Sequence, residues 1–371
     1  MHLEKGILEG GMQPRQEQWE GMRIPAHECV GFSIIPAAPG VSPQYNTAMS
    51  TPSKEQVPRY RLGDTMTFLS PVGLGTWQFS QGRGMIGKFW PSLSDDAVTD
   101  IVKRALQGGI NWFDTAEAYG RGQSERALAH ALGALEVPAG EALIATKWWP
   151  VLRSSQSLER SVQERRAALQ ERPITLYQIH QPYSRSPIAA QMAVMARLID
   201  EGLIQHAGVS NFSAEQMAEA HRALKAHGHR LVSNQVRYNL LDRQVETNGV
   251  LETARNLGMS IIAYSPLAQG LLTGKFHFGS ARPRGVRRWD PHFRAAYLHK
   301  TEPLLRVVQT IAEANQVTPA QVALNWLITT PGQCVLAIPG ATSVEQASQN
   351  AAAMLWTLSA SDRAALDRAA W

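Results

Sequence analysis

The chain has 371 residues, of which 44% are hydrophobic and 18% charged, as in ordinary globular proteins. No stretch approaches the roughly 20 apolar residues that a membrane span needs, and the first residues lack the charged head and apolar run of a signal peptide. The two cysteines cannot form a disulfide framework. We therefore expect a cytoplasmic protein with no membrane partner.

The net charge of +5 is unevenly distributed along the chain. Residues 1–58 carry four basic and six acidic side chains, which leaves 32 basic and 25 acidic ones for the rest. A modest positive excess suits an anionic small molecule, and the chain has no interleaved basic and aromatic pattern typical of nucleic-acid binding. We expect a small-molecule partner and no nucleic acid. The sequence indicates neither a monomer nor a homo-oligomer.

Residues 1–58 mix Gly, Pro, Gln and Ser with little periodicity, and the stretch from Pro36 to Pro52 has hardly any helix or strand pattern. They are predicted to be a disordered N-terminal extension. An alternative is that the natural chain starts at Met49 and that the upstream part is an over-extended gene model. Neither interpretation gives these residues a catalytic role.

Regular patterns begin at Arg59. Arg59–Leu62 and Thr65–Leu69 flank Gly63-Asp64, which predicts a β-hairpin. Eight apolar runs typical of buried strands come next: Val72–Gly75, Ile110–Asp114, Ala142–Trp148, Ile174–His180, His206–Ser210, Val232–Val236, Ser260–Ser265 and Cys334–Ile338. Helical patterns follow them near Asp95–Gly108, Ser124–Leu132, Gln156–Leu169, Pro187–Glu201, Ala214–His227, Gln244–Leu257, Pro303–Ile328 and Val344–Met354.

This alternation predicts an α/β fold, a (β/α)8 TIM barrel over residues 59–371 with an N-terminal β-hairpin. Ser359–Ala370 is expected to form a C-terminal extra helix. In such barrels the chemistry lies at the C-terminal ends of the strands. Polar residues interrupt the apolar runs at that end again and again: Asp114, Lys147, His180, Ser210-Asn211, Gln235 and Tyr264-Ser265.

The stretch from Trp112 to Gly120 places Asp114 at a strand end and Tyr119 on the following loop. A lysine is usually a surface residue, but Lys147 ends an apolar run beside two tryptophans. Asp114 can keep its ammonium charged, and that charge in turn favours the phenolate of Tyr119. The trio forms a proton relay, whereas Glu117 is expected to be a loop or surface residue.

His180 closes another apolar run, and we expect it to orient and polarise a carbonyl group. A metal site is disfavoured, because no Cys or carboxylate pattern with ligand spacing accompanies it. A further alternative, an unrelated barrel in which Lys147 forms a Schiff base, is less favoured still.

Gly82-Arg83-Gly84-Met85-Ile86-Gly87 matches the dinucleotide fingerprint G-x-G-x-x-G. That fingerprint binds a pyrophosphate only where it joins a strand directly to a helix. Here Lys88-Phe89-Trp90-Pro91 follows in place of a helix. We interpret the motif as a flexible loop over the pocket.

Taken together, these residues resemble the aldo-keto reductase family from about Tyr60 to the C-terminus, and within it the bacterial and plant-plastid branch related to potassium-channel β subunits. The matching segments are Gly73–Trp77, Phe113–Ala116, Tyr119-Gly120, Thr146-Lys147, Gln178–His180, Gly208–Phe212, Asn234–Val236, Tyr264–Leu267, Gly270–Lys275 and Ile338–Ala341.

The resemblance implies a tetrad of Asp114, Tyr119, Lys147 and His180, with Tyr119 as general acid and hydride from the nicotinamide C4 of NADPH, without a metal. It implies that Ser210, Asn211 and Gln235 hold the carboxamide and that Tyr264 stacks on the nicotinamide. The other implied cofactor-binding residues are Thr76, Trp77, Ser265, Pro266, Leu267, Gly270, Leu272, Lys275, Gly340, Thr342, Gln346 and Asn350.

One departure from the family pattern concerns the cofactor. Relatives that prefer NADPH often place Lys or Arg after the Pro-Gly-Ala, whereas this chain has Thr342-Ser343. A phosphate without such a partner loses charge-assisted hydrogen bonds. Either NADH is also used, or another cation substitutes. The candidates are Lys275, Arg282, Arg284, Arg287, Arg288 and Arg294. An equally favoured interpretation of the arginine cluster is a solvated face of a loop.

The expected function is NAD(P)H-dependent reduction of aldehydes or ketones to alcohols, an oxidoreductase activity on a small-molecule carbonyl substrate. An aromatic lining would favour apolar or planar carbonyl compounds. The candidate pocket walls are Trp77, Phe79, Trp90, Trp148, Trp149, Tyr183 and Phe276. The alternative is a slow-turnover, cofactor-binding regulatory or scaffold subunit resembling the channel β subunits.

Overall fold

The computed structural model describes residues 57–83, 90–279, 281–283 and 285–370. Residues 1–56 of the predicted extension, including the candidate start Met49, therefore lie outside the described residues. Val57, the first of these, is buried against the core, so the packed part of the chain begins before Arg59. No helix in the described part is both long and apolar enough to cross a membrane.

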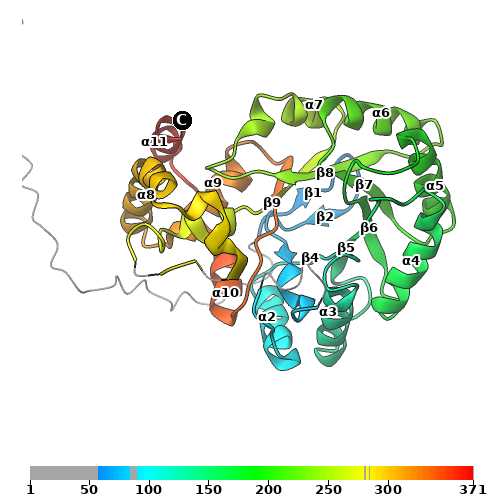
Figure 1. Ribbon diagram of the computed structural model, residues 1–371, viewed down its shortest axis with the longest axis horizontal. Coiled ribbons are helices and arrows are strands. Elements are labelled where there is room, and N and C mark those ends of the chain that lie inside the picture. Colours follow the sequence, from blue (N-terminus) through cyan, green and yellow to red (C-terminus); the bar gives the residue numbers. More distant parts are fainter. Residues whose placement is uncertain (1–56, 84–89, 280, 284, 371) are drawn as a thin grey trace, which may run out of the picture. The chain divides into compact units, whose positions relative to one another are not determined.

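Eight parallel strands form one curled sheet whose spatial order follows the chain (Figure 1). They are β3 (Leu74–Gly75), β4 (Trp112–Asp114), β5 (Leu143–Trp148), β6 (Ile174–Ile179), β7 (His206–Ser210), β8 (Leu231–Arg237), β9 (Ser260–Tyr264) and β10 (Val335–Ala337). Parallel bridges from Val72 to Ala337 and from Gly75 to Gly340 join the first strand to the last. The sheet thus closes into the predicted barrel, with all eight strands at the expected places.

The predicted hairpin closes the N-terminal end of this barrel. β1 (Tyr60–Arg61) pairs antiparallel with β2 (Phe68–Leu69). Inward-facing strand residues such as Trp112 and Leu176 pack against Leu62 of the hairpin in one apolar cluster, because alternate residues of a strand point to opposite faces. Gly73 allows the close approach of β3, since a Cβ there would lie 2.3 Å from the Trp112 ring.

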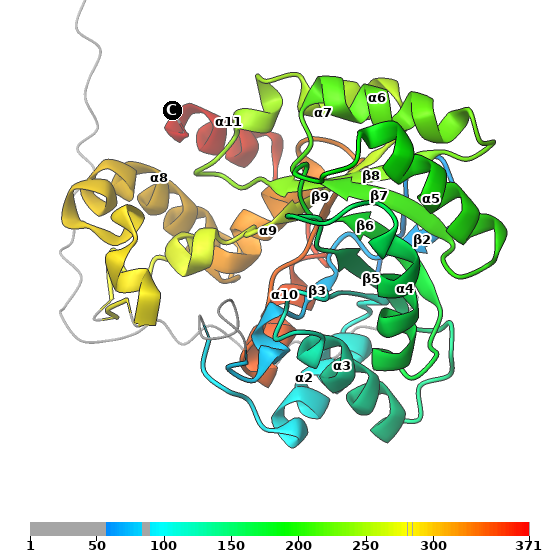
Figure 2. The same cartoon turned by 45° about the vertical axis from the view of Figure 1, so that its right-hand side comes forward.

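Helices cover the outside of the barrel, and a second, larger apolar cluster fills the space between them and the strands. They are α2 (Asp95–Gln107), α3 (Gln123–Ala134), α4 (Ser157–Ala168), α5 (Ile188–Asp200), α6 (Ala214–Lys225), α7 (Val250–Asn256), α8 (Ala295–Ala314), α9 (Pro319–Thr329), α10 (Val344–Ala352) and α11 (Ala360–Ala369). Short 3-10 helices lie at η2 (Trp77–Ser80), η3 (Gln244–Glu246), η4 (Ala268–Thr273), η5 (Gly285–Trp289) and η6 (Pro291–Phe293). The predicted C-terminal helix α11 packs beside α8 (Figure 2).

The prediction of a single helix over Pro303–Ile328 is wrong. Two helices, α8 and α9, occupy this region, and α8 begins eight residues before Pro303. The break between them is a capping box, in which the Thr318 hydroxyl accepts from Gln321 N and the Gln321 side chain accepts from Thr318 N. The Gln244–Leu257 prediction likewise resolves into η3 and α7.

Candidate active site

The predicted site residues gather at the C-terminal ends of the strands. Asp114 ends β4, Lys147 lies one residue before the end of β5, and His180 follows β6 directly. Because the strands are parallel, these ends meet on one side of the barrel. Lys147 pairs in register with Gln178 of β6, and Asp114 with Ala145 of β5.

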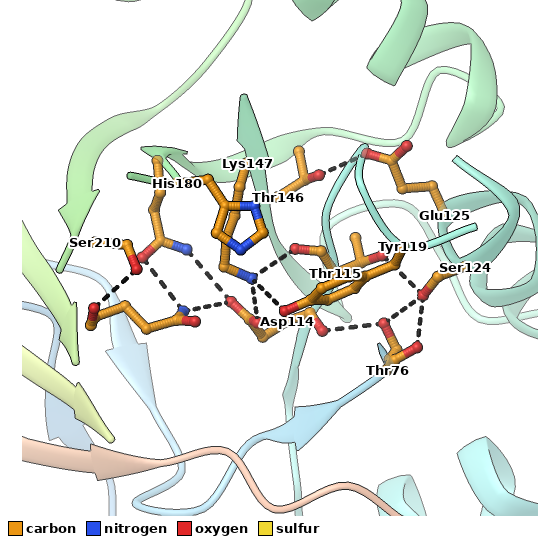
Figure 3. A network of polar contacts seen from close by, with 12 residues as sticks. Thr76, Asp114, Thr115, Tyr119, Ser124, Glu125, Thr146, Lys147, His180 and Ser210 are labelled. Atoms are coloured by element: carbon orange, nitrogen blue, oxygen red, sulfur yellow. Dashed lines mark hydrogen bonds and ion pairs between the residues drawn. The ribbon is translucent and has the colours of Figure 1, made fainter. Parts of the chain in front are cut away.

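Lys147 is fully buried, and its ammonium group has three acceptors (Figure 3). It donates to Asp114 Oδ1 at 2.5 Å, to the carbonyl oxygen of Thr115 at 2.8 Å and to the Tyr119 hydroxyl at 3.5 Å. Burial alone would lower the pKa of Lys147, but the Asp114 carboxylate and then Tyr119 raise it above its ordinary value. The lysine is therefore a permanent cation at neutral pH, which disfavours its use as a Schiff-base nucleophile.

The second oxygen of Asp114 accepts two amide hydrogen bonds. Gln235 Nε2 donates to Oδ2 at 2.8 Å, and Gln178 Nε2 donates to it at 3.3 Å. The Thr76 hydroxyl, buried beside Ser124, donates to the Asp114 carbonyl oxygen at 3.0 Å. Gln235 and Thr76, both predicted to bind the cofactor, are thus engaged in holding Asp114.

Tyr119 differs from the expectation in the net direction of its pKa. Burial raises the pKa of the phenol, and this effect exceeds the opposing effect of the Lys147 charge. The phenol is thus protonated at neutral pH, which is the form that a proton donor needs. The adjacent ammonium would stabilise the phenolate left after proton transfer.

His180 lies edge-on to the Tyr119 ring, with the two ring centroids 5.8 Å apart. Burial, and then the positive charge of Lys147, hold the pKa of His180 well below its ordinary value. The imidazole is therefore neutral. Its Nδ1 atom is buried and has no hydrogen-bond partner in the described part of the chain.

Three of the seven predicted pocket walls surround these groups. Trp77 stacks on Tyr119 at 6.1 Å, Trp90 meets Trp77 edge-on at 6.0 Å, and Trp149 meets His180 edge-on at 5.2 Å. Tyr183 is exposed. The prediction is wrong for the other three: Phe79 and Trp148 lie in the core between strands and helices, and Phe276 packs on Phe293.

The residues predicted to hold the nicotinamide end are tied to one another. The Tyr264 hydroxyl donates to Asn211 Oδ1 at 3.1 Å, and Asn211 Nδ2 donates to Ser210 Oγ at 3.1 Å and to the His180 carbonyl oxygen at 3.3 Å. Ser210 Oγ donates to the Gln235 carbonyl oxygen at 2.8 Å. This chain of bonds fixes Tyr264 and Asn211 beside the tetrad.

The loop after β9 has an unusual backbone. Ser265, Ala268, Gln269 and Gly270 all have positive φ angles, the last three in succession, and this region is costly for residues other than glycine. The amides of Gly270 and Leu272 donate to the Leu267 carbonyl oxygen, and the Leu272 side chain lies in the core. Pro266 is buried at the start of this loop.

Two cations of this region lie close together. Burial, and then the positive charge of Arg287, lower the pKa of Lys275, and burial lowers the pKa of Arg287. Within the residues that the structure describes, neither cation forms a salt bridge with a carboxylate. Of the other candidate cations, Arg288 lies over Trp289 and Arg284 lies outside the described residues. An anion placed between these two cations would relieve their mutual repulsion.

The residues after β10 form the remaining part of the predicted cofactor site. Gln346 Oε1 accepts from the Thr342 amide at 2.9 Å and from its hydroxyl at 3.1 Å, at the start of α10. Asn350 Nδ2 donates to the Gly340 carbonyl oxygen at 3.3 Å. A Cβ at Gly340 would lie 2.1 Å from the amide end of the Gln78 side chain, which would have to move to make room for it.

Two further sequence interpretations concern a metal site and the glycine motif of residues 82–87. No group of three or more His, Cys, Asp or Glu side chains among the described residues is arranged to hold a metal ion. Residues 84–87 of the glycine motif lie outside the described residues, so its interpretation as a loop over the pocket stays a prediction.

Glu117 lies on a loop, as expected, but it is not a surface residue. Its side chain is buried and belongs to a cluster of charged residues that the sequence interpretation missed: Glu117, Glu125, Arg153 and Arg165. One signal was present, because Arg165 falls on the apolar stripe of α4 with Leu158 and Val162. A charge on a buried stripe implies a buried partner.

The chain is similar to known proteins over most of its length. Residues 71–370 match the model of the aldo/keto reductase family. An uncharacterised oxidoreductase of Mycobacterium tuberculosis is 43% identical over 81% of this chain and 90% of its own length. A chloroplastic pyridoxal reductase of Arabidopsis thaliana is 32% identical over 81% of this chain and 83% of its own. The structure of a Klebsiella pneumoniae aldo-keto reductase in complex with NADPH superimposes with a TM-score of 0.66 at 26% identity, covering 84% of this chain and 95% of that one.

Proposed function

The chain belongs to the aldo/keto reductase family and is an oxidoreductase, and from that membership we propose that it reduces aldehydes or ketones to alcohols with NADPH, using Tyr119 as the proton donor. The observation that carries this proposal is the contact of 3.5 Å between the Lys147 ammonium and the Tyr119 hydroxyl, beside the ion pair of Lys147 with Asp114. A buried phenol next to a permanent cation is a proton donor whose conjugate base is stabilised.

The proton and the carbonyl are handled by different side chains. Tyr119 donates its proton to the carbonyl oxygen, and Lys147 compensates the negative charge left on the phenolate. Asp114 keeps Lys147 charged through the 2.5 Å contact. His180, held neutral by burial and by the nearby lysine, donates a hydrogen bond that orients the carbonyl oxygen.

The chain's own residues fit a dinucleotide. NADPH, when bound, supplies the hydride. Lys275 and Arg287 are partly buried, lie close together and have no carboxylate partner in the described part of the chain, which suits the phosphates of the cofactor. Tyr264 and Asn211, fixed by their mutual hydrogen bond, would hold the nicotinamide end. Thr342, Gln346 and Asn350 would hold the adenosine end.

The aromatic surroundings of Tyr119 and His180 support a preference for planar or apolar carbonyl compounds. Trp77, Trp90 and Trp149 contribute ring faces and edges there, and apolar pockets with few polar groups bind such molecules best. The Arabidopsis relative is named a pyridoxal reductase. Pyridoxal therefore belongs in the substrate panel beside benzaldehyde and a hydrophilic control, glyceraldehyde.

The test uses the full chain with NADPH and this panel, and compares wild type with Tyr119→Phe. We expect the variant to lose about 10²- to 10⁴-fold in kcat while its affinity for NADPH, followed by quenching of protein fluorescence, stays the same. Unchanged turnover in the variant would remove Tyr119 from its role. Tight NADPH binding without aldehyde-dependent oxidation would favour the alternative of a regulatory or scaffold subunit.

A further inference from the structure

Four charged side chains that take no part in the proposed chemistry form the charged cluster: Glu117, Glu125, Arg153 and Arg165. The side chains of Glu125, Arg165 and Glu117 are only 0%, 8% and 9% exposed. Burying ions is costly unless their partners are well placed. The cluster lies on the outer side of β5, because Lys147 and its neighbour Thr146 point to opposite faces of the strand. Figure 3 shows Thr146 directed towards Glu125, away from the tetrad.

Glu117 uses both carboxylate oxygens within this cluster. Oε1 accepts from the Trp149 amide at 3.0 Å and from the Arg153 guanidinium. Oε2 accepts from Ser161 Oγ at 2.5 Å and from Arg165 Nη1 at 3.2 Å. Four donors, two from the loop after β5 and two from α4, therefore converge on one side chain.

These bonds join the two halves of the proton relay. Glu117 stands two residues before Tyr119 on the β4–α3 loop. Its amide donates to the Lys147 carbonyl oxygen at 3.3 Å, and its carboxylate accepts from the Trp149 amide. The loop that carries the phenol is thus bound, through one residue, to the strand end that carries the ammonium.

Arg165 supports this attachment from a second side. Its Nε atom lies 3.1 Å from Glu125, whose other oxygen accepts from Thr146 Oγ1 at 2.5 Å. Thr146 directly precedes Lys147. One guanidinium on α4 therefore connects Glu117, on the loop of the phenol, with Glu125, which holds the strand of the lysine.

We propose that Glu117 is a positioning residue for the proton transfer: its carboxylate holds the Tyr119 loop against the end of β5 and so fixes the distance between the Tyr119 hydroxyl and the Lys147 ammonium. This inference rests on the proposed function, because it requires Tyr119 to be the proton donor. The interaction of two charges varies inversely with their separation, so a loosened loop weakens the stabilisation of the phenolate.

The experiment compares Glu117→Gln with a matched control, Glu159→Gln. The first substitution keeps the size of the side chain but removes the charge that attracts two arginines. Glu159 pairs with Arg197 across α4 and α5, and both side chains are 52% exposed, so its loss has little effect. The readouts are kcat, the affinity for NADPH and the pH profile of the reverse reaction, alcohol oxidation, in which the Tyr119 phenolate accepts the proton.

For Glu117→Gln we expect a fall of about 10- to 100-fold in kcat, unchanged affinity for NADPH, and a shift of the alcohol-oxidation profile to higher pH. The profile reports Tyr119 because the groups facing it, Asp114, Lys147, His180 and Tyr264, stay in place. A merely structural role would lower the melting temperature and the fraction of active molecules, without moving the pH profile.

Ser161→Ala provides a milder variant that leaves all four charges in place, in case Glu117→Gln does not fold. It removes one donor to Glu117 and the acceptor of the buried Tyr177 hydroxyl, and we expect a smaller shift of the pH profile in the same direction. A wild-type pH profile in both variants, or in Ser161→Ala alone if Glu117→Gln is unfolded, would overturn the inference. If Tyr119→Phe is as active as wild type, the proposed function fails instead, which separates the two results.

Discussion

The tetrad region and the loop after β9 lie on the same side of one barrel but are built in opposite ways. Around Lys147 every charge has its partner, because the ammonium contacts Asp114, Thr115 and Tyr119, and Asp114 accepts two further amides. Around Lys275 and Arg287 two cations lie close together without a carboxylate, on a loop with three successive left-handed residues.

The difference indicates how binding energy is divided between the two regions. The four proposed catalytic side chains are held in place by contacts within the protein, so a bound substrate would have little to reorganise there. The loop after β9 keeps an unfavourable repulsion between Lys275 and Arg287, which an anionic cofactor would relieve. The tetrad region should therefore govern stability and turnover, and the loop should govern affinity for the cofactor.

The largest expected effect comes from Lys147→Met. Removing one partner leaves Asp114 as an uncompensated buried charge, and we expect the free energy of unfolding to fall by about 3–5 kcal/mol. The double variant Asp114→Asn with Lys147→Met should recover much of this loss, because neither charge then remains. Denaturant unfolding measures the free energy of unfolding of both variants. If Lys147→Met is as stable as wild type, the conclusion that the tetrad region governs stability is wrong.

A smaller effect concerns Glu125, next to the tetrad strand. Burial, opposed by Arg165 and Thr146, raises the pKa of its carboxyl from 4.5 to about 7. The folded chain then binds this proton more tightly than the unfolded chain, so the stabilisation is complete below about pH 4.5 and is lost as the pH rises through 7.

As the pH rises from 4.5 to 8, deprotonation of Glu125 should lower the free energy of unfolding of the wild type by about 3 kcal/mol. Glu125→Gln has no such proton and should not show this fall. Unfolding by urea at several pH values, with Glu159→Gln as the exposed control, would reveal the difference. Parallel pH dependences for wild type and Glu125→Gln would contradict it.

The smallest expected effect on stability, and the one confined to binding, comes from Arg287→Met. Loss of a charge-assisted contact should weaken NADPH binding about 10- to 100-fold. The free energy of unfolding should hardly change, because the lost contacts of Arg287 with the Trp90 ring and the Gln269 carbonyl oxygen are offset by the lost repulsion with Lys275. Arg288→Met, in the same segment but stacked on exposed Trp289, is the control.

Titration with both NADPH and NADH sharpens this prediction. A loss of affinity confined to NADPH would assign Arg287 to the 2′-phosphate. Arg287 would then replace the basic residue that relatives carry where this chain has Thr342-Ser343. An equal loss for both would assign it to the pyrophosphate. Unaltered affinity for both cofactors would remove Arg287 from the binding site.

The barrel could be predicted from the sequence because its signal is local. Each strand is a short apolar run, and each end carries a polar residue, so the eight strands and the gathering of Asp114, Lys147 and His180 follow from alternation and handedness. The start of α8 was predicted too late because Pro303 was interpreted as a helix start. The boundary between α8 and α9 was predictable, since Thr318-Pro319-Ala320-Gln321 carries the capping-box pattern.

The charged cluster could not be predicted in the same way. Glu117 finds its partners at Trp149, Arg153, Ser161 and Arg165, more than 30 residues further along the chain, and no local pattern says which of the many acidic residues will meet them. The net pKa direction of Tyr119 was missed for a related reason: it depends on how deeply the ring is buried, which only the packed structure determines.

The closure of the barrel between its first and last strands limits how far the chain can fold while it is being synthesised. All four tetrad residues have been synthesised by His180, yet the ring is sealed only when residues 335–340 reach Val72 and Gly75. The N-terminal hairpin also lacks one of its contacts until then, because the Tyr60 hydroxyl donates to the carbonyl oxygen of Ile328. A nascent chain released at about residue 330 would carry every proposed catalytic side chain and still be an open sheet, with two exposed strand edges inviting aggregation. The chain therefore contains all four proposed catalytic residues about 150 residues before the strand that closes the barrel around them has been synthesised.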